Sequence, residues 1–190
     1  MRGECRAHGH LGAVHLSLGN FLQAAKCHQE QLDRARDVRD PKLEAGAHAA
    51  LGLAATALGR HEDAIGSFEQ QLAALEQLGA AAAANTTSGE EDKDLDRGRA
   101  FGNLGTCYRA LGDEDEAVKW LDKYLSSALQ SQSSRDQDKA YRELGAAHKT
   151  LGNLQQALVR EKNEKSLLCH RFLIVNRSFF DFDVSFTSLC

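Results

Sequence analysis

One pattern occurs four times along this chain, and its regular spacing limits the possible fold more than any other feature. Written out, the pattern is Ala-x3-Leu-Gly-x5-Leu-Gly-x4-Ala. The four copies begin at Ala7, Ala47, Ala100 and Ala140. Successive copies are 40 residues apart, except that 53 residues separate the second from the third. An insertion that leaves the pattern intact on both sides is typical of a solenoid, in which insertions enter loops and the repeated units restack.

Each copy reads as a helix that ends in a tight turn. In the third copy, Ala100, Leu104 and Leu111 fall at i, i+4 and i+11, which is one face of a helix with 3.6 residues per turn. Gly105 follows the first leucine and allows a neighbouring helix to approach closely. Gly112 follows the second leucine and is expected to end the helix, because glycine adopts the left-handed conformation without a Cβ clash.

A second helix is predicted directly after that turn. Polar residues that can cap it follow the turn glycine at Asn20, Asp113 and Asn153. Arg60 stands at this position in the second copy and cannot act as a cap. The closing alanine of the pattern lies where the two helices cross, and apolar residues such as Phe68 and Leu72 continue at helical spacing. Each copy is therefore interpreted as a short helical hairpin.

The pattern resembles the tetratricopeptide repeat, in the 40-residue form of scaffold and spindle-orientation proteins with Leu-Gly-Asn motifs. Residues 102–105, Gly-Asn-Leu-Gly, are such a motif, and the resemblance covers about residues 4–160. It implies an all-α, right-handed superhelical solenoid of four hairpins, about eight helices, with an irregular C-terminal tail. Residues 3–11, 64–72 and 96–105 resemble the last repeats of a large scaffold linked to the spindle midzone and midbody. By this resemblance, we expect a non-catalytic cytoplasmic protein at the cytoskeleton (spindle, midbody, centrosome) that acts in mitosis and cell division.

The repeat spacing divides the chain into six segments. They are a first repeat at 1–40, a second at 41–78, an inserted acidic loop at 79–94, a third repeat at 95–134, an incomplete fourth repeat at 135–166 and a non-repeat tail at 167–190. The first helix is expected to end near residue 18. The next six are expected to span 21–37, 41–58, 61–78, 95–111, 114–131 and 136–151, and the eighth to begin at 154. Asp40-Pro41 marks one start, with aspartate as the cap and proline at the first helical position.

Two segments depart from the repeat. The insertion combines an alanine run with small and acidic residues, which favours a frayed helix extension leading into a flexible loop; the alternative is a regulatory loop phosphorylated on Thr86, Thr87 or Ser88. In the fourth copy, Glu161 and Lys165 occupy positions that should be apolar. Beyond them, residues 180–186 alternate as a strand would, which indicates a non-homologous, weakly ordered and aggregation-prone tail. The alternative is a tail that docks on the last helix.

The composition argues against several classes of function. A net charge of −4 disfavours non-specific nucleic-acid binding, and no apolar run suits a signal peptide or a membrane span. The five cysteines lack a C-x-x-C pair, which indicates reduced thiols. No catalytic constellation or phosphate-binding loop is present, so we expect no enzyme activity and no cofactor. Cys5, His8, His10 and His15 suggest a metal site only weakly, because His10 points away from the others and no closing pair of ligands follows.

The predicted binding surface is the concave groove that the first helices line in this family. Two positions of each repeat are expected to face it: the residue before the leading alanine and the fourth residue after the first glycine. The candidate groove residues are Arg6, Arg99, Asn103, Arg109, Lys139, Arg142 and Lys149. They predict a partner protein with an extended, acidic segment. The alternatives are that these cations pair with neighbouring acidic residues, and that the chain is a spacer without a ligand. Self-association through exposed ends is also plausible.

Overall fold

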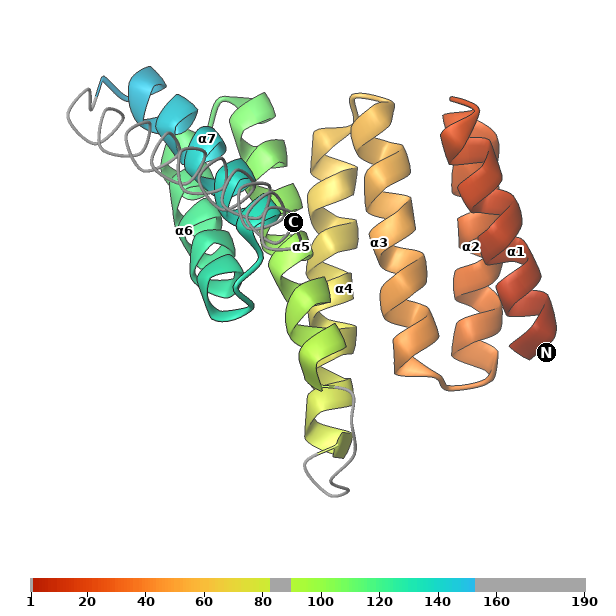
Figure 1. The fold of residues 1–190 in the computed structure, drawn as a ribbon. Helices are drawn as coiled ribbons and strands as arrows, with labels where there is room; N and C mark the ends of the chain where they lie inside the picture. The colour runs from red at the N-terminus through yellow and green to blue at the C-terminus, as the bar shows by residue number, and fades with distance from the viewer. Residues whose placement is uncertain (1, 83–89, 153–190) are drawn as a thin grey trace, which may run out of the picture.

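The protein is an all-α solenoid of antiparallel helices. The computed structural model describes residues 2–82 and 90–152, and within these ranges every regular element is a helix. The helices are α1 (Arg2–Ser17), α2 (Phe21–Asp37), α3 (Pro41–Ala57), α4 (His61–Ala82), α5 (Glu90–Leu111), α6 (Glu114–Gln130) and α7 (Ser134–Thr150). They stand in a row in chain order, each packed on the next (Figure 1). The predicted fold class is confirmed, while the eighth helix and the tail lie outside the described residues.

The turn glycines have the predicted conformation. Gly19, Gly59, Gly112 and Gly152 have φ angles of 76°, 74°, 82° and 74°. In the first three turns the following amide donates back into the last turn of the helix, for example from Asn20 N to His15 O at 2.9 Å and from Asp113 N to Tyr108 O at 3.0 Å. This closes the helix end and satisfies carbonyls that would otherwise lack donors. In these three hairpins the second helix starts two residues after the glycine, at Phe21, His61 and Glu114.

The predicted helix caps are confirmed at Asp40 and Asp113 and wrong at Asn20, although α2 begins at Phe21 as predicted. The Asp40 carboxylate accepts from Lys42 N at 3.2 Å and from Leu43 N at 3.4 Å, with Pro41 as the first residue of α3. Asp113 accepts from Glu116 N at 3.2 Å and caps α6. The Asn20 side chain makes no capping hydrogen bond to α2. A carboxylate offers two acceptor oxygens and a charge that the helix N-terminus attracts, whereas an asparagine amide offers one neutral acceptor. Asn153 lies outside the described residues.

The connections between hairpins use the same turn without glycine. Arg39 and Gln132 have φ angles of 51° and 53°. The amides that follow them donate to Ala35 O at 3.2 Å and to Ala128 O at 3.1 Å. A side chain in this left-handed region carries a steric cost of about 1–2 kcal/mol.

Replacing Gln132 with glycine should therefore stabilise the protein. We expect Gln132→Gly to raise the free energy of unfolding by about 1 kcal/mol, because the steric cost disappears while the turn hydrogen bonds remain. Urea denaturation followed by circular dichroism measures the change. Ser131→Gly is the matched control, because Ser131 has a right-handed backbone with φ of −78° and should gain nothing. Equal or lower stability of Gln132→Gly relative to this control would contradict the account.

The helices enter the predicted acidic loop from both sides. α4 continues to Ala82 and α5 already begins at Glu90, so both are longer than the sequence predicted. Alanine has the highest helix propensity of any residue, which favours the extension of α4 through the alanine run. Residues 83–89, which include the three candidate phosphorylation sites, lie outside the described residues.

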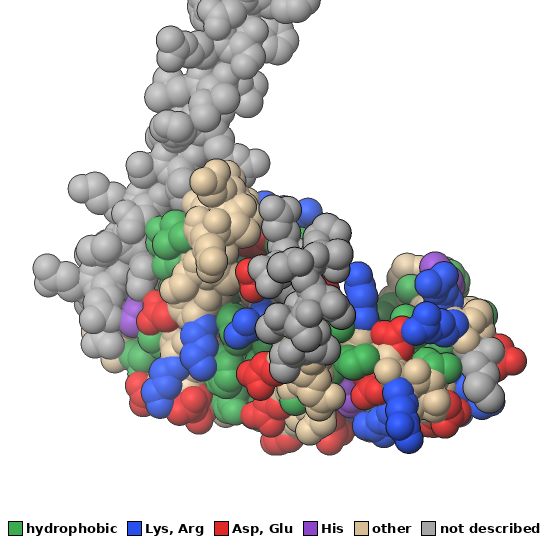
Figure 2. All heavy atoms as spheres, turned by 90° about the horizontal axis from the view of Figure 1, so that it is seen from below, with side chains coloured by type: hydrophobic (Ala, Val, Ile, Leu, Met, Phe, Trp, Pro, Cys, Tyr) green, Lys and Arg blue, Asp and Glu red, His purple; other side chains and the backbone are tan. Residues whose placement is uncertain are grey.

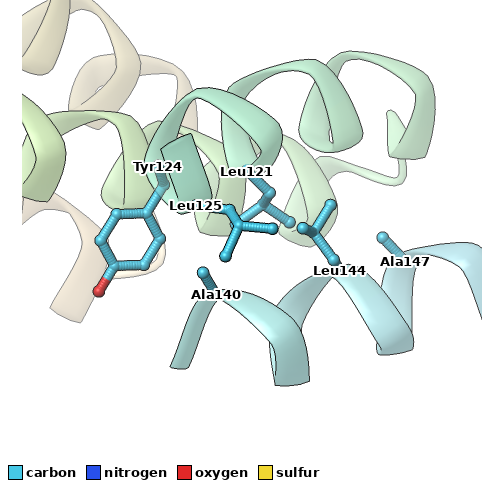
Figure 3. Packing of buried hydrophobic residues seen from close by; sticks show 6 residues of the cluster. All are labelled: Leu121, Tyr124, Leu125, Ala140, Leu144 and Ala147. Atoms are coloured by element: carbon cyan, nitrogen blue, oxygen red, sulfur yellow. The ribbon is translucent and has the colours of Figure 1, made fainter. Parts of the chain in front are cut away.

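The core of the solenoid is built from the repeated alanines and leucines. The closing alanines Ala24, Ala64 and Ala117 are completely buried, as are the leading alanines Ala47, Ala100 and Ala140. Figure 3 shows how one hairpin packs on the next: the side chains of Leu121 and Leu125 on α6 point toward Ala140, Leu144 and Ala147 on α7. Small side chains on a first helix thus pack against large side chains of the preceding second helix.

The first glycine of each pattern allows the two helices of a hairpin to touch. A Cβ atom added to Gly12, Gly52 or Gly105 would lie 2.5 Å, 2.5 Å and 2.6 Å from the nearest side-chain atom of the second helix. The residues met are His28, Phe68 and Leu121, which occupy the same repeat position. The predicted close approach is therefore confirmed in all three hairpins that the structure describes on both sides.

One buried histidine makes stability depend on pH. His48 of α3 is buried, at the position that Phe101 and Tyr141 fill in later repeats. Burial lowers the pKa of His48 below its ordinary value, and the nearby charge of Arg36 lowers it further. The folded state therefore favours the neutral ring. This contribution is fully present above the ordinary pKa of 6.5 and is lost as the pH falls below it.

We expect the wild-type protein to lose more stability than His48→Phe between pH 7.5 and pH 5. Phenylalanine fills the same position elsewhere in the chain and takes up no proton. The measurement is the free energy of unfolding in urea at both pH values for both proteins. Other groups titrate in both proteins, so the difference between the two losses isolates His48. Equal losses would refute the assignment.

Candidate functional site

The first helices present one residue of each repeat just before the leading alanine, which is buried on α3, α5 and α7. These residues are Arg6 on α1, Gly46 on α3, Arg99 on α5 and Lys139 on α7, and all four are exposed. Successive helical residues are turned by about 100°, so the side chain beside a fully buried alanine is directed out of the helix-packing interface. The helix that carries Arg6, α1, lies at one end of the row of helices, and α7, which carries Lys139, follows the other described helices (Figure 1).

The charges of Arg99 and Lys139 act on the same carboxylate. Both charges lower the pKa of Asp136, which lies at the start of α7. Burial raises the pKa of this carboxyl, but hydrogen bonds from the Ser133 hydroxyl (2.6 Å) and the Tyr124 hydroxyl (2.8 Å) act in the opposite direction with these charges. The net pKa lies below the ordinary value. Asp136 thus lies within electrostatic reach of one exposed cation from each of two neighbouring repeats, and we call Arg99, Lys139 and Asp136 the Asp136 site.

Each cation of the Asp136 site has a further contact. Arg99 Nη1 lies 3.5 Å from Asp96 Oδ1 on the same helix, and the side chains are half-exposed. Lys139 Nζ lies 6.0 Å from the centre of the Tyr124 ring. An exposed ion pair three residues apart is worth only a few tenths of a kcal/mol, so a stronger ligand can displace Asp96 from Arg99.

Arg109 is held between helices. Its Nη1 donates to Glu143 Oε2 on α7, and its Nε lies 3.5 Å from Glu114 Oε2 on α6, an ion pair that lacks hydrogen-bond geometry. Only about a quarter of the Arg109 side chain is exposed. The sequence pattern did not single out Glu143 or Glu114. Glu143 could have been identified from its repeat position, because it occupies in the fourth copy the position that Asn103 occupies in the third.

The remaining candidate residues on α5 and α7 are Asn103, Arg142 and Lys149. Asn103 is half-buried on α5, one turn beyond Arg99, while Arg142 and Lys149 are exposed on α7. At the Arg109 position the second repeat has Thr56, whose hydroxyl donates to Gly52 O at 2.8 Å and lies 3.5 Å from Cys107 Sγ. Figure 2 shows lysine and arginine side chains interspersed with aspartate and glutamate over the face seen from below.

Cys5 and His8, two of the candidate metal ligands of α1, have structural contacts. The Cys5 thiol is buried and lies 3.4 Å from Gln31 O, and His8 Nδ1 lies 2.8 Å from Glu30 Oε2. Burial raises the pKa of both the Cys5 and Cys107 thiols. Within residues 2–82 and 90–152, no three histidine, cysteine, aspartate or glutamate side chains are grouped so as to hold a metal ion. In the same ranges, no helix is long and apolar enough to cross a membrane.

The comparisons with known proteins agree on one repeat family. Two models of the family described as "Tetratricopeptide repeat" match the chain, one at residues 3–77 and one at residues 98–130. No curated protein matches the chain in sequence.

Solved structures show the same fold at low sequence identity. BtubC (BKLC) from P. vanneervenii superposes with a TM-score of 0.76 at 18% identity over 88% of this chain and 64% of BtubC. The TPR domain of Arabidopsis FLU superposes with a TM-score of 0.59 at 23% identity, over 68% of this chain and 98% of that domain. A Rap protein complexed with competence and sporulation factor superposes with a TM-score of 0.70 at 15% identity, over 87% of this chain and 44% of that protein.

Proposed function

Because the chain belongs to the tetratricopeptide repeat family, with matches over residues 3–77 and 98–130, we propose that it is a non-catalytic interaction scaffold. It binds an extended, acidic segment of a partner protein along its first helices. The observation that carries this proposal is the Asp136 site, where Arg99 and Lys139 lie within electrostatic reach of the same carboxylate from neighbouring repeats. The complex of a structural neighbour with competence and sporulation factor is consistent with partner binding.

The Asp136 site suits an acidic segment because its cations are exposed and only weakly paired. A ligand carboxylate that replaces Asp96 as the partner of Arg99 forms a charge-assisted hydrogen bond. Asn103, one turn along α5, can donate to and accept from the ligand backbone with its side-chain amide. Arg109 contributes differently: a ligand must compete with Glu143 and Glu114 for it. We propose Arg6, Arg142 and Lys149 as further, peripheral contacts because all three are exposed on first helices.

Fluorescence anisotropy tests this proposal directly. The probe is a fluorescein-labelled peptide rich in aspartate and glutamate, and its asparagine and glutamine counterpart is the control ligand. We expect the acidic peptide to bind, and Arg99→Glu with Lys139→Glu to weaken binding at least tenfold, since charged hydrogen bonds contribute about 1.5–3 kcal/mol each. Arg97→Glu is the matched control: Arg97 is exposed on α5, two residues from Arg99 and on another face. Equal weakening by Arg97→Glu would contradict the proposed site.

The second candidate function is that of a structural spacer. The ion pairs within the chain favour it: Arg109 pairs with Glu143 and Glu114. Arg99 pairs with Asp96. The charges of both cations are then already neutralised by acidic side chains of the same chain. In that case the acidic and neutral peptides bind equally weakly, and the charge reversals change stability only.

The cellular setting is proposed from the resemblance to Leu-Gly-Asn repeat scaffolds. We place the protein in the cytoplasm, at the spindle midzone and midbody of dividing cells. Imaging the full fluorescently tagged chain through mitosis tests this: enrichment at the midzone is expected, with loss in Arg99→Glu/Lys139→Glu. A diffuse signal through division would contradict the placement.

A further inference from the structure

The exposed face of α3 carries no charge between its first turn and its end. After Lys42, the exposed residues of this helix are Gly46, Leu53 and Ala57, and Ala50 is partly exposed between the first two. Every other described helix exposes at least one charged side chain beyond its first turn. α3 is an internal helix of the row, with the first helices α1 before it and α5 after it (Figure 1). We call Gly46, Ala50, Leu53 and Ala57 the α3 stripe.

The four residues of the α3 stripe lie on one side of the helix. They are spaced by four, three and four positions, which brings them to the same face of a helix with 3.6 residues per turn. Leu53 supplies most of the apolar surface, and 47% of it is exposed. The space over Gly46 is open, because a Cβ atom built there meets nothing within 4 Å outside its chain neighbours and the backbone of its own helix. A ligand side chain can therefore lie over the small residues and against Leu53.

The α3 stripe offers a ligand no hydrogen-bonding side chain. Beyond Glu44, the polar side chains of α3 are those of His48 and Thr56. His48 is buried, and the Thr56 hydroxyl donates to Gly52 O at 2.8 Å. A charged or polar ligand residue placed on the stripe would lose water without gaining a side-chain partner. The stripe therefore favours an apolar ligand residue.

The same repeat positions on the following first helices carry the cations of the Asp136 site. Gly46 of α3 corresponds to Arg99 of α5 and to Lys139 of α7. Each of the three directly precedes a completely buried alanine, so they have the same orientation relative to the packing of their helices. A ligand segment that crosses α7 and α5 at the Asp136 site and continues in the same direction along the row reaches the α3 stripe.

We propose that the partner segment has two parts: acidic residues that bind Arg99 and Lys139, and an adjacent apolar residue of about the size of leucine that packs on the α3 stripe. This inference rests on the proposed function and adds what distinguishes one acidic segment from another. A segment that is acidic throughout would place a charge on the stripe, and a segment that is apolar throughout would leave the two cations without a ligand. Both are disfavoured, which makes the binding selective.

Fluorescence anisotropy with matched peptides and the full chain tests the proposal. Two peptides carry one leucine beside a run of aspartate and glutamate, one on its N-terminal side and one on its C-terminal side. The reference peptides carry serine in place of leucine. We expect one of the leucine peptides to bind about tenfold more tightly than its serine reference, because its side chain leaves water for the stripe. The peptide that shows the gain also identifies the direction in which the segment runs.

Leu53→Ser assigns the gain to the stripe. We expect this variant to remove the advantage of leucine and to leave the affinity for the serine peptides unchanged. Leu129→Ser is the matched control and should keep the advantage, because Leu129 is similarly exposed, at 50%, but lies near the end of the second helix α6. Circular dichroism confirms that both variants are folded.

The outcomes separate this inference from the proposed function. Serine peptides that bind, and that lose affinity in Arg99→Glu/Lys139→Glu, support the acidic site by themselves. If leucine then adds nothing, or its advantage survives Leu53→Ser, the two-part segment is refuted while the acidic site stands. If no peptide binds, both are refuted. Sedimentation velocity identifies a different occupant: a dimer of the wild type that Leu53→Ser dissociates would mean that a second copy covers the stripe, and would overturn the proposal.

Discussion

Gly52→Ala is expected to lower the free energy of unfolding by about 2 kcal/mol, although alanine is the better helix former. A Cβ atom at this position would lie 2.5 Å from Cε1 and 2.7 Å from Cζ of Phe68. Phe68 is completely buried on α4 and packs with Ala55, Ala64 and Leu104. Its ring cannot swing away without displacing these neighbours, so α3 and α4 must separate. The cost of this overpacking exceeds the gain in helix propensity of up to about 1 kcal/mol.

Gly46→Ala is the matched control on the same helix. Apart from its chain neighbours and the backbone of its own helix, no heavy atom lies within 4 Å of a Cβ atom built at Gly46, and the residue is exposed. The substitution should therefore stabilise the protein by about 0.5–1 kcal/mol through helix propensity alone. Urea unfolding of the wild type and both variants, followed by circular dichroism, measures the opposite signs. Stabilisation by both substitutions would show that α3 and α4 do not approach as described.

Leu104→Ala should destabilise the protein by about 2–5 kcal/mol, the range for removing a fully buried leucine side chain. Leu104 is completely buried on α5, in contact with the cluster around Phe68 and Cys107. Leu11 has the same position in the first repeat and is half-exposed. Leu11→Ala should therefore cost about 1 kcal/mol, because it removes much less apolar surface from contact with protein.

The comparison measures the exposed end of the solenoid. Both variants carry the same chemical change at the same repeat position, so the difference between them reports only what covers each leucine. Unfolding is measured in urea at low protein concentration, at which any dimer has dissociated. Equal losses for Leu104→Ala and Leu11→Ala would contradict the described burial of one and exposure of the other.

Local rules explain why much of the fold could be predicted. The turn glycines, such as Gly59 and Gly112, need only their own backbone conformation, which the pattern identifies at once. The Asp40-Pro41 start is equally local, since the cap bonds to amides two and three residues ahead. Gly52 was predicted to permit close approach because a small residue recurs at one position of a helical face. In each case the information lies within a few residues of chain.

The candidate site depends on contacts between repeats, and these could be predicted only in part. Arg99 and Lys139 were identified by their shared repeat position. The pairing of Arg109 with Glu143 joins residues 34 positions apart, and a charge pattern on one helix does not show which acid faces it. The same limit applies to Asp136, which the hydroxyl of Tyr124 reaches from α6. Prediction of helix caps from residue type also fails at Asn20: asparagine often caps helices, but this side chain makes no capping hydrogen bond.

Chemical-shift mapping of the acidic peptide on the isotopically labelled full chain tests the central claim most directly. The account predicts that the largest backbone amide shifts occur on α5 and α7 around Arg99, Asn103 and Lys139, and that they disappear in Arg99→Glu/Lys139→Glu. Shifts that gather on the second helices α4 and α6, or that persist unchanged in the double variant, would contradict a binding surface on the first helices.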